Sequence, residues 1–143
     1  MADLILLPII PLAIIIGLYE LIAIHADMNF RGSHWFGHGL SAIVVIAIGL
    51  FITMNTEYFL EVTNIINSGI PLIGSPLAVR IAVGLILNLK IHAQSALAKG
   101  TLASRGLAEH WTHTLIVSAL VVIAPYLWPI LEPIVPYYLG GSS

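Results

Sequence analysis

The chain has 143 residues, of which 59% are hydrophobic and 8% are charged, and its formal net charge at pH 7 is −2. A soluble fold of this length cannot bury so much apolar surface, so the composition excludes a soluble protein and indicates an integral membrane protein. Cysteine is absent, which excludes disulfides, thiolate metal sites and cysteine nucleophiles. The few basic residues form no cluster, so we expect no nucleic-acid partner.

Four apolar stretches are each long enough for a transmembrane helix, which needs about 20 mostly apolar residues. In chain order they cover approximately Leu4–Ala26, Trp35–Met54, Leu77–Ala98 and Leu107–Trp128. The first has no basic flank and no cleavage-site pattern, so we expect it to be retained in the mature protein. The predicted fold class is an all-α integral membrane protein with four transmembrane helices arranged as two hairpins.

The segments outside these stretches carry helix-breaking residues. Residues 55–75 mix acidic, amide, glycine and proline residues, and predict an interfacial loop with one short helix. Pro125, Pro129 and Pro133 recur every four residues near the end of the last stretch. Because each proline removes a backbone hydrogen bond, we expect this helix to fray into an irregular tail near Trp128.

The two predicted hairpins share one order of landmark residues, including all six histidines and two of the three tryptophans. The matched pairs are Pro11 and Pro76, Gly17 and Gly84, His25 and His92, His34-Trp35 and His110-Trp111, and His38 and His113. This order predicts a tandem duplication, with repeat 1 over about 4–60, repeat 2 over about 71–133 and an irregular tail over 134–143. Such repeats are expected to be related by a parallel pseudo-twofold axis along the membrane normal.

The basic residues are distributed unevenly over the connections. Arg31 lies between the first two predicted helices, and Lys99 and Arg105 lie between the last two. The N-terminus, the middle connection and the C-terminal tail contain no Lys or Arg. The positive-inside rule therefore predicts that the first and third connections are cytoplasmic and that both termini are outside.

On this topology all six histidines lie toward the basic face, where imidazole and carboxylate groups could bind a transition metal. The predicted metal ligands are His25, His38, His92, His113 and Glu20, with Cu, Zn or Fe as the candidate metals. Two facing histidines on separate helices could instead hold a b-type haem. The competing interpretation is that the His-Trp pairs only anchor helix ends at the headgroups and that the other histidines pack helices together.

Two further charges lie inside the predicted spans. If the first and third helices are adjacent, Glu20 and Lys90 could form an ion pair that joins the hairpins. Alternatively, the Lys90 ammonium extends to the basic face, while Arg80 extends to the opposite face. Neither Glu20 nor Lys90 is repeated in the other copy, where Leu87 and Ala23 stand instead.

The sequence contains no nucleotide-binding loop, nucleophile triad or metalloprotease motif, so a non-catalytic role is favoured over an enzyme. Our first hypothesis is an accessory or structural subunit of a larger membrane complex, such as a respiratory or metal-dependent oxidoreductase, including a copper monooxygenase type. The expected partners are membrane lipids and other membrane subunits. The alternatives are a histidine-based metal or haem protein in electron transfer or metal transport, and a proton or cation pathway through Glu20, His92 and Lys90.

Overall fold

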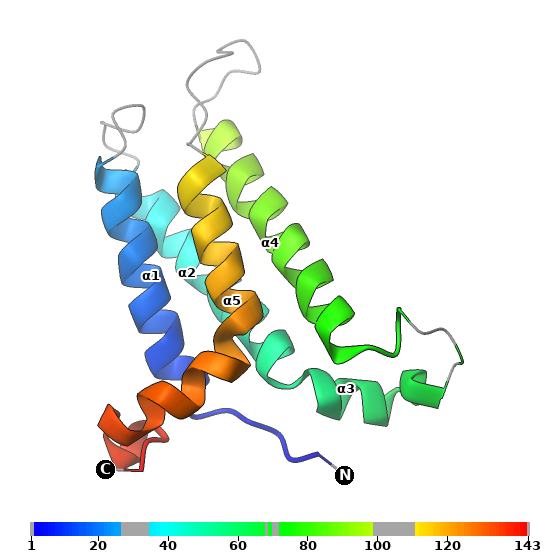
Figure 1. The fold of residues 1–143 in the computed structure, drawn as a ribbon. Coiled ribbons are helices and arrows are strands. Elements are labelled where there is room, and N and C mark those ends of the chain that lie inside the picture. Colours follow the sequence, from blue (N-terminus) through cyan, green and yellow to red (C-terminus); the bar gives the residue numbers. More distant parts are fainter. Residues whose placement is uncertain (1, 27–34, 68, 70–71, 99–110, 143) are drawn as a thin grey trace.

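The computed structural model describes residues 2–26, 35–67, 69, 72–98 and 111–142, and this part of the chain is helical without any strand. Its long helices are α1 (Ile9–Ala26), α2 (Trp35–Met54), α4 (Pro76–Ala98) and α5 (Trp111–Leu131). Shorter elements are α3 (Thr56–Val62) and the 3-10 turns η2 (Ile65–Asn67), η3 (Glu132–Ile134) and η4 (Tyr137–Leu139). Figure 1 shows α1, α2 and α5 grouped together, α4 inclined beside them and α3 projecting to one side.

The all-helical class is confirmed, and several predicted helix bounds agree with the structure. The second predicted helix coincides with α2, and α4 begins at Pro76, one residue before the predicted start at Leu77. Proline suits this position because its missing N–H would have no partner in a first helical turn. The short helix expected in the middle connection is α3.

The predicted start of the first helix at Leu4 is wrong, because α1 begins at Ile9. The backbone of Ile5 is bound instead by Asn55, at the far end of α2. The Ile5 N–H donates to Asn55 Oδ1 at 2.5 Å, and Asn55 Nδ2 donates to Ile5 O at 2.8 Å. The Asn55 side chain thus satisfies the backbone N–H and C=O of Ile5 outside a helix. At 18 residues, α1 is about 27 Å long.

The predicted fraying of the last helix near Trp128 is also wrong, because α5 continues to Leu131 with Pro125 and Pro129 inside it. Proline weakens a helix, but Ala124 and Trp128 of this segment are buried in the core. Their burial stabilises the helical path. Beyond Leu131 the chain forms the 3-10 turns η3 and η4. The predicted start at Leu107 lies outside the described residues.

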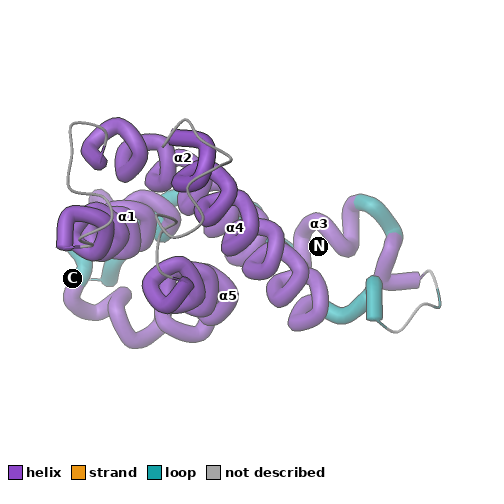
Figure 2. Tube along the Cα trace, turned by 90° about the horizontal axis from the view of Figure 1, so that it is seen from above, coloured by secondary structure: helices purple, strands orange, loops and turns teal. Residues whose placement is uncertain are grey.

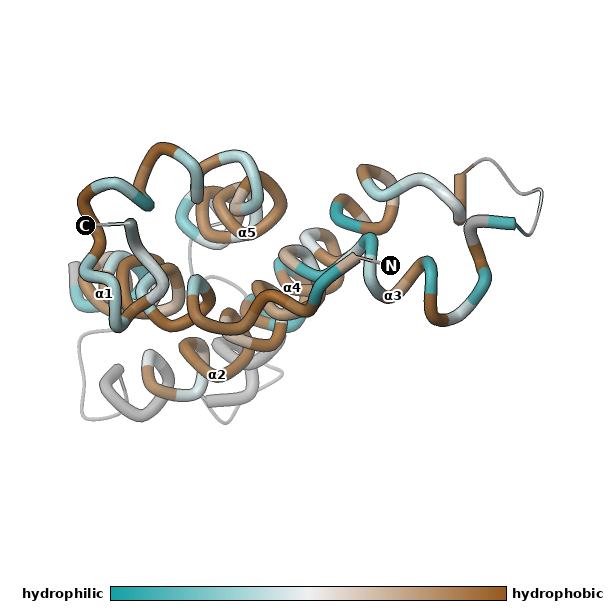
Figure 3. The backbone as a smooth tube through the Cα atoms, turned by 90° about the horizontal axis from the view of Figure 1, so that it is seen from below, coloured by the Kyte–Doolittle hydropathy of each residue, from teal (hydrophilic) through white to brown (hydrophobic). Residues whose placement is uncertain are grey.

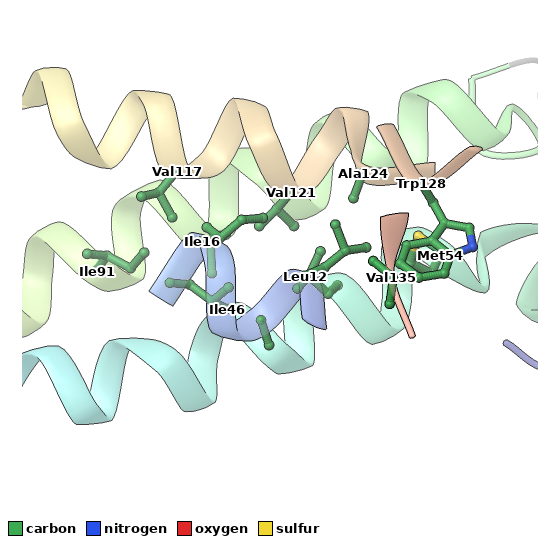
Figure 4. Close-up of a cluster of buried hydrophobic side chains, with 13 residues drawn as sticks. Leu12, Ile16, Ile46, Met54, Ile91, Val117, Val121, Ala124, Trp128 and Val135 are labelled. Atoms are coloured by element: carbon green, nitrogen blue, oxygen red, sulfur yellow. The ribbon is translucent and has the colours of Figure 1, made fainter. Parts of the chain in front are cut away.

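The long helices pack around α2 and α5, each of which contacts the other three long helices. The neighbours of α1 are therefore α2 and α5, whereas α4 packs on α2, α5 and α3. Figure 2 shows this arrangement along the bundle, with α2 and α5 on opposite sides of the line from α1 to α4. Apolar side chains fill the space between the helices, as Figure 4 shows for Leu12, Ile46, Val117 and Val121.

Two glycines allow close contact between sequential helices. A Cβ atom at Gly17 in α1 would lie 2.6 Å from Ile43 Cγ1 in α2. A Cβ atom at Gly84 in α4 would overlap Val122 Cγ2 in α5. Both positions therefore need glycine for α1 to approach α2 and for α4 to approach α5.

Apolar residues cover the outside of the bundle as well as its interior. On α1 the exposed residues include Ile14, Leu18 and Ile22, and Figure 3 shows hydrophobic residues along the long helices and hydrophilic ones in and near α3. Two described helical spans, Pro76–Ala93 and Trp111–Ile134, are long and apolar enough to cross a membrane. The segments Gly39–Met54 and Thr56–Val62 form a third such span if this pair, bent by 63°, counts as one.

The two ends of the bundle differ in which parts of the chain they contain. The C-terminal ends of α1 and α4 and the N-terminal ends of α2 and α5 meet at one end, which we call the hairpin end (Figure 1). The opposite end, which we call the terminal end, holds α3 and both chain termini. There the Ala2 N–H donates to Glu61 Oε2 at 2.8 Å, and Gly140 lies against Leu7.

Candidate functional site

A carboxyl group and an imidazole meet inside the bundle near the hairpin end. Glu20 of α1 has an exposed fraction of 0%, and its Oε2 lies 3.2 Å from Nδ1 of His113 in α5. The His113 side chain is 10% exposed. Ionisable side chains are expensive to place in an apolar interior and are retained there when they are paired or have a function. This pair is therefore the candidate site.

The helical periodicity of α1 and α5 places the two side chains inside. Glu20 follows Leu12 and Ile16 at intervals of four residues, so it lies on the same buried face of α1. On α5, His113 begins the buried stripe that continues through Val117 and Val121. Because α1 packs on α5, these two faces meet and the pair links the first helix of one hairpin to the second helix of the other.

Further polar groups lie beside the pair on α4 and α5. Asn88 Nδ2 donates to Thr114 Oγ1 at 3.2 Å, and the Thr114 hydroxyl donates to the Trp111 carbonyl at 3.0 Å. Ser118 lies one turn further along α5, and its Oγ is buried without a hydrogen-bond partner in the described part of the chain. The site is thus a polar layer made by three helices.

His92 takes a different role from the buried His113. Its ring stacks on Trp111, with the centroids 4.0 Å apart and an interplanar angle of 27°. Stacking of this kind joins α4 to the first residue of α5. It is the kind of helix-packing contact that the competing interpretation of the histidines expects.

The structure brings together only part of the predicted metal set. Glu20 and His113 are in contact, His25 is exposed at the end of α1, and His92 stacks on Trp111. His38 lies in the first turn of α2, but its side chain is not among the described groups. His34 and His110 lie outside the described residues. Among the described residues, no group of three or more His, Cys, Asp or Glu could hold a metal ion. Glu20 and His113 alone supply two donors, fewer than a protein zinc site uses.

The predicted Glu20–Lys90 ion pair is wrong. Glu20 faces His113, and Lys90 is exposed on the outer side of α4. The reason is the order of the helices, because α1 neighbours α2 and α5 rather than α4. The alternative prediction for Lys90, an ammonium group directed out of the bundle, agrees with this exposure.

Arg80 forms a second polar cluster at the terminal end, and it was not predicted as a site. Its Nε donates to the Thr53 carbonyl at 3.2 Å and its Nη1 to the Tyr126 hydroxyl at 3.1 Å. Its Nη2 lies 3.5 Å from Glu57 Oε1. The cluster joins α2, α3, α4 and α5. Arg80 is only 7% exposed by side chain, so it is bound by protein groups instead of extending to the membrane surface as predicted.

A fully apolar interval separates the two polar clusters. Residues 10–18 of α1, 46–52 of α2, 81–87 of α4 and 119–125 of α5 contain no side chain with a polar group. Seven helical residues span about 10 Å. Buried members of these segments, including Leu12, Leu50 and Val121, form one core cluster. The interior between the two clusters is therefore packed with apolar side chains.

This arrangement can link helices and can exchange a proton between a carboxyl group and an imidazole at one end. A continuous transmembrane path would need polar groups through the middle of the bundle. Comparison with known proteins finds no matching family model, no curated protein and no solved structure of significant similarity.

Proposed function

We propose that the chain is a small accessory subunit of a larger integral membrane complex. The observation that carries this proposal is the apolar interval, about 10 Å long, that separates the Glu20–His113 pair from the Arg80 cluster. Each cluster joins several helices to one another. An interior whose polar groups bind helices together, and whose middle is packed, supports a structural role over catalysis or transport.

The proposed subunit has four transmembrane helices formed by a duplicated hairpin with a parallel pseudo-twofold axis. In support, α2 has 20 residues, close to the length that a bilayer core requires, and α1 has 18. Gly17 and Gly84 occupy matched sequence positions, and each closes its own hairpin against a β-branched side chain. A close glycine contact between the two helices of each hairpin fits a duplicated hairpin, although the partner side chains, Ile43 and Val122, are not at matched positions.

We propose that the terminal end faces outside and that the hairpin end faces the cytoplasm. The described segments at the terminal end, residues 2–8, 55–67, 72–75 and 132–142, contain no Lys or Arg, whereas Arg31, Lys99 and Arg105 stand in the sequence between helices whose joined ends meet at the hairpin end. This charge bias follows the positive-inside rule.

Respiratory or metal-dependent oxidoreductases, including a copper monooxygenase type, are the host complexes we would test first. The support is the chemistry of the hairpin end, which holds the Glu20–His113 pair and also His25 of α1 and His92 of α4. The exposed His25 imidazole could contribute to a cofactor that a neighbouring subunit also binds.

Purification from native membranes tests the subunit proposal. An affinity-tagged chain, extracted in mild detergent, is expected to co-purify with a constant set of other membrane proteins identified by mass spectrometry. Gly84→Leu, which would overlap Val122 and separate α4 from α5, is expected to lose these partners, whereas Ala82→Leu on the exposed face should keep them if that face meets lipid. Recovery of the chain alone, stable and folded, would contradict the proposal.

A second candidate function, a proton or cation pathway, is favoured by the buried Glu20–His113 pair itself. In that role Glu20 would take up the transported ion from the hairpin end. The purified chain in liposomes would then carry a proton or cation flux that Glu20→Gln abolishes and that Glu61→Gln at the terminal end leaves unchanged. A flux equal to that of empty liposomes would end this candidate.

A further inference from the structure

An open groove runs between α2 and α4 on the outer surface of the bundle. Its cavity volume is about 140 Å³, and its lining is mainly apolar residues of both helices. From the terminal end toward the hairpin end, α4 contributes Val83, Ile86 and Leu87, and then Lys90. These residues span about 10 Å along the helix.

Lys90 supplies the only charged group among the residues that line this groove. It is exposed and has no ion-pair partner in the described part of the chain. Glu20 does not line the groove, because its buried carboxyl group faces His113. The groove is thus apolar along its length and ends at an ammonium group that has no counter-charge among the described residues.

The depth of Lys90 matches the boundary between lipid chains and headgroups. His92 stacks on Trp111, the first residue of α5, so the two residues lie at one level. Tryptophan is typical of the headgroup level, and Lys90 lies two residues, about 3 Å, below it. The flexible lysine side chain can therefore place its ammonium at the level of lipid phosphates.

We propose that this groove binds an anionic phospholipid, with one acyl chain along Val83, Ile86 and Leu87 and the phosphate on Lys90. The apolar lining is complementary to hydrocarbon, and the single cation at the headgroup level is complementary to a phosphate. An apolar helix of another subunit would leave the ammonium group without a counter-charge. This inference does not depend on the proposed function, because the lipid binds whether or not other subunits are present.

The charge part of the proposal is tested by titrating the purified full-length chain, in uncharged detergent, with long-chain phosphatidylglycerol or phosphatidylcholine. Retained lipid is counted by native mass spectrometry. The chain is expected to retain phosphatidylglycerol more tightly, and Lys90→Gln is expected to reduce this preference about fivefold. Lys90→Arg keeps the charge and should keep the preference. Equal retention of the two lipids, or an unchanged preference in Lys90→Gln, would overturn the proposal.

The groove part is tested with a matched pair of substitutions on adjacent exposed residues of α4. Ile86→Trp fills the groove and is expected to reduce retention of phosphatidylglycerol, whereas Leu85→Trp lies outside the lining and should not. In native membranes, a single cysteine introduced as Ile48→Cys reports what occupies the groove, because the chain has no other cysteine. The lipid site predicts no cross-link to protein there; a specific cross-link to another subunit would show that a helix fills the groove and would overturn the proposal.

Discussion

The two ends of the bundle connect helices to one another through different chemistry. At the hairpin end, Glu20 and His113 form a pair of which the carboxylate is completely buried. At the terminal end, Arg80 binds a backbone carbonyl, a hydroxyl and Glu57, whose side chain is 65% exposed. The first contact joins two buried side chains at 3.2 Å, whereas Arg80 binds three partners, one of them mostly exposed.

This difference sets the energetic importance of each residue. Removing one member of a buried ionisable pair leaves the other in an apolar interior, where an uncompensated charge is costly. Removing a solvent-exposed member of a cluster leaves its partner with water and with its other contacts. We therefore expect substitutions at the hairpin end to have larger effects than substitutions at the terminal end.

The largest effect is expected for His113→Ala. It removes the imidazole that faces the buried Glu20 carboxyl group, and the free energy of unfolding should fall by about 3 kcal/mol. Unfolding of the chain in mixed detergent micelles, followed by circular dichroism, measures this change. Thr112→Ala, at the neighbouring exposed position of α5, is the matched control and should change stability by less than about 0.5 kcal/mol. Equal effects of the two substitutions would contradict the importance of the buried pair.

Arg80→Ala is expected to be the next most severe change. It removes the hydrogen bonds to the Thr53 carbonyl and the Tyr126 hydroxyl and should cost about 2 kcal/mol. Arg80→Lys keeps the charge but loses the planar guanidinium that reaches several acceptors, so it should fall between wild type and Arg80→Ala in the same unfolding measurement. If Arg80→Lys were as stable as wild type, charge alone would account for the cluster.

Asn55→Ala should act locally at the terminal end. The amide that binds both backbone groups of Ile5 is lost, at a cost of about 1 kcal/mol, and the N-terminal segment should detach from α2. Hydrogen exchange at the Ile5 amide is expected to become faster while exchange in α5 stays unchanged. Asn67→Ala, whose side chain bonds only to nearby Asn64, is the control. Unchanged exchange at Ile5 in Asn55→Ala would contradict the role given to this contact.

The smallest effect is expected for Glu57→Gln. The ion pair with Arg80 is 3.5 Å long and its carboxylate is mostly exposed, so its removal should change stability by less than about 0.5 kcal/mol. The comparison of the two ends would fail if Glu57→Gln destabilised the chain as strongly as His113→Ala.

The sequence predicted features that depend on local patterns. Trp35 and Met54 bound a mostly apolar run, and α2 has those bounds. The short helix α3 was expected from the mixed polarity of the segment after α2. Glu20 and His113 were selected because ionisable residues inside an apolar span need partners.

The features that the sequence did not predict depend on contacts between distant residues. The Asn55 side chain, which binds the backbone of Ile5 ahead of α1, lies fifty positions away in the chain. The partner of Glu20 depends on which helices are neighbours, and apolar periodicity alone does not determine that order. Arg80 has no spacing motif with Thr53 or Tyr126, so its contacts required the arrangement of the helices.

The central claim, that this chain is one subunit of a larger membrane assembly, is tested most directly by the mass of the particle that contains it. The chain itself has a mass of 15.4 kDa. Native mass spectrometry of the untreated particle from native membranes is expected to give a larger mass that other polypeptides account for after dissociation. A particle that dissociates into this chain and lipid alone, as a monomer or as identical copies, would contradict the account.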